Sequence, residues 1–327
     1  MLRFLLRRLA NYAVLLFIAV SLAYLMASVT MDPRNAFDWS NPDLNRDAVN
    51  ATLTSYNINP DTSPLLRYSR WLKEVFGHWN WGYTPKGEAV NELMSTKVWV
   101  SVRLVSIGTL LGMVVGVSLG AWTAVRQYSF ADRGFSLLAL LLISTPTVVL
   151  AVTLQMIATW INTAAGYPVF EFIGETGQSA PGFFPRLLDR LQHLLLPTLS
   201  LSLMQMASYS RYQRNLMLDT LGADYVRTAR AKGLRKGKAI RRHALRNAII
   251  PMATQLAFSV ALVFTGAAMT EKIYGWHGMG AYSVEAIGAQ DINGSVAVAA
   301  FSGVCVLTGA VLSDILIAAI DPRVRTN

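Results

Sequence analysis

Charged residues and cysteines are scarce in this sequence. Only 15% of the 327 residues are Asp, Glu, Lys or Arg, and 53% are hydrophobic, whereas a soluble protein of this size carries about 25% charged residues. Cys305 is the single cysteine, which excludes an internal disulfide and a metal cluster built on cysteines. The shortage of charge indicates an integral membrane protein.

Enzymatic motifs are missing as well. The four histidines lie in different loops without the spacing of metal ligands, and no serine lies in a Gly-x-Ser-x-Gly elbow. The segment "GLRKGKA" (233–239) differs from a phosphate-binding loop, because three residues instead of four separate its glycines and Ala239 follows the lysine. We therefore expect no enzyme activity, no metal site and no ATP hydrolysis in this chain.

Long apolar runs are abundant instead. A membrane span needs roughly 20 mostly apolar residues, and six segments qualify. The fourth reaches this length if the side chains of Arg211 and Arg214 extend from the apolar region to the membrane interface. The first opens with three arginines, as a signal peptide does, but its run is longer than the roughly 7 to 15 residues of a cleaved signal. We predict an all-α integral membrane protein with six transmembrane helices at 9–29, 104–125, 134–161, 194–217, 248–270 and 296–320.

The placement of Lys and Arg predicts the orientation. With the N-terminus inside, the inner segments hold 18 Lys and Arg in 60 residues, and the outer segments hold 11 in 131. The acids are distributed the other way, with 4 inside and 14 outside. Because cytoplasmic loops carry the basic excess, we expect both termini, including the tail 321–327, to lie in the cytoplasm.

Several features inside the predicted spans have a structural interpretation. Four glycines recur at every fourth position of the second span, which places them on one helix face where another helix can approach closely. Pro146 removes a backbone donor in the third span and is expected to kink it. The glycines are Gly108, Gly112, Gly116 and Gly120.

Three polar side chains in the spans have two interpretations each. Gln155 and Gln205 either join helices or line a translocation path. Asp314 lies six residues before the end of the last span, so we favour pairing with a cytoplasmic arginine over a proton relay. The spans contain no second carboxylate or buried lysine that would complete a relay.

The predicted outer segment 30–97 is long and begins with a Pro-, Asn- and Asp-rich stretch. We interpret it as a small cap on the outer membrane face, with Trp79 and Trp81 as interfacial anchors. Contact with an extracytoplasmic partner is the alternative.

The basic inner loop 211–247 is predicted to contain two helices. The first ends near Lys232, where Gly233 supplies a left-handed stop, and Asp219 or Asp224 serves its beginning. The second starts near Lys236 and places Ile240, Ala244 and Ala248 on one face.

We consider three kinds of binding partner for this loop: anionic lipid, nucleic acid and another protein. Anionic lipid near Arg241 and Arg242 is plausible, whereas nucleic acid is not, since neither interleaved aromatics nor a recognition fold is present. Ala229 and Ala231 suggest a small-residue surface that inserts into a partner's groove, so Ala229→Arg and Gly233→Pro are expected to disrupt docking.

Several segments of the chain resemble those of a known protein family. "YVRTARAKGL" followed by "RHALRNAIIP" is similar to the cytoplasmic EAA-type loop of ATP-binding-cassette (ABC) importer permeases, in the branch that handles dipeptides, oligopeptides and nickel. "STPTVVLA" (144–151), "EKIYGWHGMG" (271–280) and "DPRVR" (321–325) resemble other segments of that branch. Arg227 stands where the general motif has Glu, and His277 where a proline is usual.

The resemblance implies a type I ABC importer permease fold, with an N-terminal segment 1–29, the cap 30–97 and a permease core 98–320. It implies that the loop 219–247 couples the chain to cytoplasmic ATPases, which would bind ATP and Mg²⁺, so no cofactor is expected here. The coupling helix would comprise Asp224, Tyr225, Arg227, Thr228, Ala229, Arg230, Ala231, Lys232 and Gly233.

The resemblance also implies the remaining partners: a second homologous permease forming a heterodimer, an extracytoplasmic substrate-binding protein, the lipid bilayer and a peptide substrate. The location would be the bacterial cytoplasmic (inner) membrane. A stand-alone secondary transporter or channel would need coupling-ion ligands or an inverted repeat, and a membrane enzyme would need a polar cluster at one membrane face. Neither pattern is found in the sequence.

Overall fold

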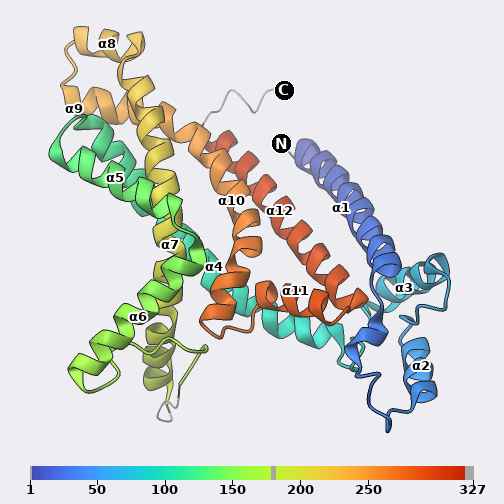
Figure 1. Ribbon diagram of the computed structural model, residues 1–327. Helices are drawn as coiled ribbons and strands as arrows, with labels where there is room; N and C mark the ends of the chain where they lie inside the picture. The colour runs from blue at the N-terminus through green and yellow to red at the C-terminus, as the bar shows by residue number, and fades with distance from the viewer. Residues whose placement is uncertain (1, 178–181, 321–327) are drawn as a thin grey trace. The chain divides into compact units, whose positions relative to one another are not determined.

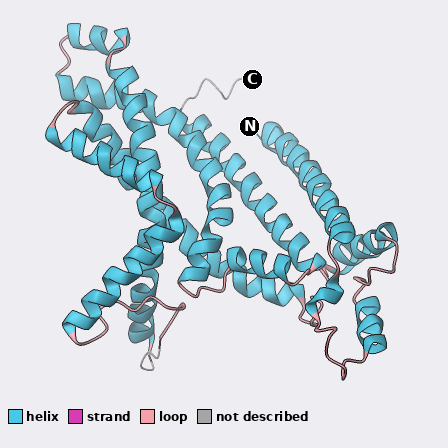
Figure 2. Ribbon diagram, viewed as in Figure 1, coloured by secondary structure: helices cyan, strands magenta, loops and turns pink. Residues whose placement is uncertain are grey.

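The structure is a computed structural model that describes residues 2–177 and 182–320. Within these residues it consists of helices and connecting loops without strands (Figure 2), apart from one isolated bridge between Tyr83 and Ala89. The predicted cytoplasmic tail 321–327, including "DPRVR", lies outside the described residues. The all-helical prediction is confirmed for the part that is described.

The helices are joined by connections of different lengths, with longer segments between α3 and α4 and between α6 and α7 (Figure 1). In chain order they are α1 (Leu2–Thr30), η1 (Pro33–Ala36), α2 (Arg46–Ser55), α3 (Pro64–His78), α4 (Val90–Val125), α5 (Phe130–Ser144), α6 (Thr147–Ala165), α7 (Phe183–Leu221), α8 (Asp224–Ala231), α9 (Lys236–Ala239), η2 (Ile240–Ala244), α10 (Leu245–Ile273), α11 (Met279–Gly288) and α12 (Ile292–Ile320).

Four helices in the described part of the chain are long and apolar enough to cross a membrane: Arg7–Thr30, Val90–Val125, Thr147–Ala165 and Ile292–Ile315. Two further predicted spans, 194–217 and 248–270, lie within the long helices α7 and α10. The membrane character of the chain is therefore carried by several separate helices.

The predicted third span, 134–161, differs from the structure. Thr145 and Pro146 have extended backbone, and they divide the segment into α5 and α6. Proline cannot donate to the preceding turn, and it disfavours helical backbone in the residue before it. The expected kink is thus a complete break, after which α6 alone has the length and hydropathy of a span.

The chain divides into two compact units, each with its own packing. The first comprises Met1–Val102, Phe264–Ala268 and His277–Leu307. Its core joins the predicted cap to α1 and to the beginning of α12, and Trp71 of α3 lies at its centre between Tyr24 and Trp81. Trp81 thus contributes to this core, whereas Trp79 is 70% exposed.

Arg67 is a buried charge within the first unit. Its guanidinium donates hydrogen bonds to the carbonyl oxygens of Ser28 and Ile58, at 2.7 and 3.4 Å. A buried charged group is tolerated where such acceptors satisfy it. Arg67 therefore connects the cap to the end of α1.

Asp291 is a second buried charge in this unit, directly before α12. Its carboxylate accepts a hydrogen bond from the backbone N–H of Gly294 at 3.0 Å, and the Tyr282 hydroxyl donates to it at 3.4 Å. Burial raises the pKa of Asp291 to about 6. The carboxyl group thus caps α12 at an electrostatic cost near neutral pH.

The second unit comprises Arg103–Val263, Met269–Trp276 and Thr308–Asn327. Here α5 and α6 pack on α7, and the predicted glycine face of α4 lies against α7 as well. A Cβ atom added at Gly112 would lie 2.7 Å from the Ser202 carbonyl oxygen, and one at Gly116 would lie 2.7 Å from that of Met206. The prediction that these glycines admit another helix is confirmed.

Replacing Gly116 by leucine tests this contact. The new side chain meets backbone of α7 that cannot move independently, so the variant is expected to lose about 1–3 kcal/mol of stability through overpacking. The measurement is the thermal unfolding midpoint of the purified protein in detergent. Gly134→Leu is the matched control, since a Cβ at Gly134 meets no atom within 4 Å. Equal midpoints for the two variants would contradict the contact.

Replacing Asp291 by asparagine tests the cost of the buried charge. Because the folded-state pKa is raised, wild-type stability falls as pH rises from about 4 to about 6 and stays lower above that range. Asparagine keeps the acceptor for Gly294 without the charge, so the variant should be more stable than wild type by about 2–3 kcal/mol at pH 7.5 and similar at pH 4. Thermal unfolding at both pH values measures this. The exposed control Asp43→Asn should show no such pH-dependent difference, and a lower midpoint for Asp291→Asn at pH 7.5 would contradict the expectation.

Candidate functional site

The predicted coupling helix is α8, which begins at Asp224 and ends at Ala231. Asp224 lies in its first turn, where a carboxylate interacts favourably with the helix dipole. Asp219, the other candidate for this role, lies in the last turns of α7 instead. The helix therefore begins at the second of the two predicted acids.

The end of α8 is a Schellman motif. Gly233 has a φ of +89°, its N–H donates to the Arg230 carbonyl at 2.9 Å, and the N–H of Leu234 donates to the Ala229 carbonyl at 3.2 Å. A glycine at this position adopts left-handed backbone without a steric cost. The predicted stop at Gly233 is confirmed, as is the start of the next helix at Lys236.

One face of α8 is buried against its own chain. Val226 and Ala229 are 4% and 8% exposed, and they belong to a core formed mainly by small side chains. The other members of this core are Ala124 of α4, Met217 of α7, Ala239 of α9, Ala244 of η2 and Ala248 of α10. The core holds α8 close to the ends of three long helices.

This packing corrects the interpretation of Ala229. The sequence suggested that Ala229 and Ala231 form one surface for a partner, but Ala229 is buried and only Ala231 is exposed. Helical periodicity explains the difference, because Ala229 lies three residues after Val226 and therefore on its face. Ala229→Arg would disrupt the internal core before it affected any docking.

The opposite face of α8 is exposed. It presents cations, one acid and the half-exposed ring of Tyr225, which is 41% exposed. Arg227 and Asp224 form a weak pair with 3.8 Å between nitrogen and oxygen. The exposed members of the predicted set are Asp224, Tyr225, Arg227, Thr228, Arg230, Ala231, Lys232 and Gly233.

The chain after Gly233 returns toward α10 as a basic, amphipathic segment (Figure 1). Ala244 and Ala248 are buried and Ile240 packs beside them, as predicted, whereas Arg241 and Arg242 are exposed. Residues 240–244 form a π-helical turn that leads directly into α10, which continues through Pro251. The segment therefore keeps its cations away from the core that holds α8.

A buried ion pair fixes the end of α7 that carries this loop. The Asp132 carboxylate, which is 2% exposed, accepts hydrogen bonds from the Arg214 guanidinium at 2.7 and 2.9 Å and from the Tyr128 N–H at 2.9 Å. The Arg214 guanidinium holds the pKa of Asp132 below its usual range. A bidentate contact of this kind constrains both distance and orientation, so α5 and α7 are joined rigidly here.

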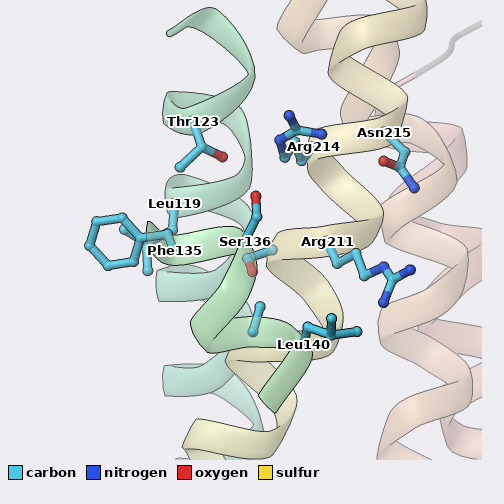
Figure 3. A pocket seen from close by; sticks show the side chains of 10 residues that line it. Leu119, Thr123, Phe135, Ser136, Leu140, Arg211, Arg214 and Asn215 are labelled. Carbon is cyan, nitrogen blue, oxygen red and sulfur yellow. The ribbon is translucent and has the colours of Figure 1, made fainter. Parts of the chain in front are cut away.

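Beside this pair is a pocket of about 320 Å³ between α4, α5 and α7 (Figure 3). Figure 3 shows Arg214 extending from α7 toward the two other helices, with Arg211 and Asn215 on the same helix. Sequence reasoning missed the role of Asp132. The available signal was the spacing Ser129-x-x-Asp132, in which Ser129 caps α5 through the Asp132 N–H.

The two glutamines predicted for a path are both half-buried and contact other helices of the second unit. Gln155 of α6 donates a hydrogen bond to the Ile273 carbonyl at 2.9 Å, at the end of α10. The Cβ of Gln205 lies against Gly112 of α4. Asp314 is half-buried in α12. These contacts show that the glutamines join helices, and a role in a path stays a prediction.

Comparison with known proteins agrees with the helical membrane fold described above. The family model described as "Binding-protein-dependent transport system inner membrane component" matches residues 116–326. The oligopeptide transport system permease protein OppB of Mycobacterium tuberculosis is 44% identical over the full length of both chains. The dipeptide transport system permease protein DppB of Lactococcus lactis is 31% identical over 99% of this chain and all of the relative.

A solved structure supports the same fold. The methionine ABC transporter MetNI in an inward-facing conformation contains a chain that is similar with a TM-score of 0.52 and 17% identity. The similarity covers 70% of this chain and 96% of the other. The fold is thus that of a type I ABC importer permease, and the chain belongs to the family of binding-protein-dependent transport system inner membrane components, which are transport subunits of ABC importers and not enzymes.

Proposed function

We propose that this chain is one of two homologous permease subunits of an ATP-driven peptide importer in the bacterial cytoplasmic membrane. The observation that carries the proposal is full-length identity of 44% to a permease named for oligopeptide transport, together with 31% identity to one named for dipeptide transport. The substrate is therefore a peptide. A second permease would complete the translocation path as a heterodimer.

The proposed topology has six spans and cytoplasmic termini. Two of the six lie in α7 and α10, whose ends carry Arg and Lys residues that extend to the interface. The basic excess of the segments 1–8, 126–133 and 211–247 supports the orientation. In this orientation the cap formed by η1, α2 and α3 faces the extracytoplasmic binding protein.

The exposed face of α8 is the proposed docking surface for a cytoplasmic ABC ATPase. Two properties support this assignment. The helix is short and ends in a defined turn, and its buried face contacts the ends of α4, α7 and α10 through the core around Ala229. A partner that moved α8 would therefore move three membrane helices with it.

ATP and Mg²⁺ would bind to the ATPase subunits, and this chain would contribute the mechanical connection. Closure of two ATPases would bring the two coupling helices together and switch the spans between outward- and inward-facing states. Such a switch depends on partners that bind the two states with different affinity. The binding protein is accordingly expected to bind the outward-facing state more tightly.

Reversing one charge on the exposed face of α8 tests the docking assignment. Arg230→Glu is expected to reduce co-purification of the ATPase at least about tenfold, as loss of a charged contact at an interface commonly costs a few kcal/mol. Lys238→Glu makes the same change of charge on α9, outside the proposed surface, and should leave co-purification near wild type. Equal loss in both variants would contradict the division of the loop into a docking helix and a basic return segment.

Peptide uptake into proteoliposomes tests the function as a whole. The complete transporter should accumulate labelled peptide only with ATP and the binding protein present, and a variant of the ATPase that cannot hydrolyse ATP should abolish uptake. Uptake by the isolated chain without an ATPase would contradict the proposal and favour a secondary transporter or channel.

A further inference from the structure

Three ligating side chains converge in the second unit, away from the coupling loop. Asp189 and His193 lie one turn apart near the beginning of α7, and Glu171 lies in the loop that follows α6. One ligand atom from each residue lies within 4.8 Å of the others. His193 and Asp189 are 4% and 7% exposed, so two of the three side chains are buried, and the Glu171 side chain is 38% exposed.

The loop that carries Glu171 is anchored on both sides. Before it, the Asn162 amide accepts hydrogen bonds from the N–H groups of Val169 and Phe170, both at 2.9 Å. After it, the Gly174 N–H donates to the Tyr274 carbonyl at 2.8 Å, and Glu175 pairs with Arg103 at 3.0 Å. These anchors place Glu171 against α7 before any ligand binds, which is the condition for a preorganised site.

The orientation of the His193 ring fits a metal ligand. Its Nδ1 atom lies 2.9 Å from the Asp189 carbonyl oxygen, which assigns the proton to Nδ1. Its Nε2 lone pair then faces Glu171, with 3.8 Å to Oε2, while Asp189 Oδ1 lies 3.3 Å from Nδ1. Metal-binding histidines commonly donate the other ring N–H to a backbone carbonyl in this way.

Gly177 marks the point at which the three side chains meet. A Cβ atom added there would lie 3.1 Å from Glu171 Oε2, 3.1 Å from His193 Cε1 and 3.2 Å from Asp189 Oδ1. The Gly177 N–H also donates to both Asp189 carboxylate oxygens, at 3.0 and 3.1 Å. The glycine thus covers the cluster with backbone and leaves the space beside it to the ligating atoms.

The charge of the cluster favours a cation. With a neutral imidazole, the buried Asp189 and the 38% exposed Glu171 place two negative charges close together, which is unfavourable without compensation. Within residues 2–177 and 182–320, the ion pairs of these two carboxylates involve only His193 and no Lys or Arg. A divalent cation would neutralise the cluster, whereas a proton on His193 would leave one negative charge.

We propose that Glu171, Asp189 and His193 bind one divalent transition-metal ion of the zinc type. Tetrahedral zinc places its ligand atoms about 3.4 Å apart, close to the 3.8 Å between His193 Nε2 and Glu171 Oε2. An imidazole ligand favours zinc and its neighbours over Mg²⁺ and Ca²⁺, which prefer oxygen. The ion would fasten the loop after α6 onto α7, a role separate from ATPase docking and from the choice of peptide.

Zinc binding by the full chain tests the proposal. The protein is purified with a tag that contains no histidine, stripped with a chelator, and titrated with Zn²⁺ while bound metal is measured by mass spectrometry. Wild type should bind one ion through this site, and His193→Gln and the half-exposed Glu171→Gln should each weaken binding at least about tenfold. The matched control is Glu175→Gln, which changes an acid of the same loop that pairs with Arg103 instead.

Thermal unfolding separates the metal from its main competitor, a protonated His193 that bridges the two carboxylates. Zn²⁺ at pH 7.5 should raise the unfolding midpoint of wild type and Glu175→Gln, and should not raise that of His193→Gln. If Zn²⁺ binds wild type and His193→Gln equally, or leaves the wild-type midpoint unchanged, the metal site is refuted. Because these readouts need neither ATPase nor peptide, their failure leaves the proposed transport function untouched, and failure of peptide uptake leaves the metal site untouched.

Discussion

The close contact between α4 and α7 is the constraint on which the second unit depends. Four glycines at intervals of four residues bring the backbone of α4 against that of α7, so that Gly116 has no room for a side chain. In a lipid environment the helices gain little from hydrophobic burial, and close van der Waals packing becomes the main source of association. The contact also fixes the C-terminal half of α7, where Arg214 binds Asp132 of α5. Together with the core around Ala229, this pair of contacts positions the coupling loop that follows α7.

The coupling loop illustrates how small side chains determine stiffness. Ala229, Ala239, Ala244 and Ala248 occupy a common core with Met217, and the alanines allow the helix axes to lie near each other. The Schellman turn at Gly233 satisfies the last carbonyls of α8 and reverses the chain within a few residues. The alanine core and the Schellman turn together leave α8 with one buried and one exposed face. In the proposed transport cycle, a force applied to the exposed face would pass to α4, α7 and α10 through the core around Ala229.

Local sequence signals predicted the features that depend on neighbouring residues. The period of the glycines, the stop at Gly233 and the start at Lys236 all follow from helix geometry, and the structure agrees with each. The break at Thr145 and Pro146 exceeded the predicted kink, since a proline in an apolar run is compatible with both outcomes. The buried side of Ala229 required knowledge of what α8 packs against. The meeting of Glu171 with His193 depends on the path of a loop, and a search restricted to histidine and cysteine spacing passes over it.

Each end of α7 carries a group of charged side chains, but the charges are arranged differently at the two ends. At one end a carboxylate from α5 binds Arg214, and the internal ion pair needs no external ligand. At the other end two carboxylates face one imidazole, and the local charge does not balance within the described residues. A bidentate arginine pair is complete as folded, whereas the cluster at His193 would be stabilised by an added cation or proton. By this difference the first site has a structural role as folded, and the second is the site at which we propose that a metal ion binds.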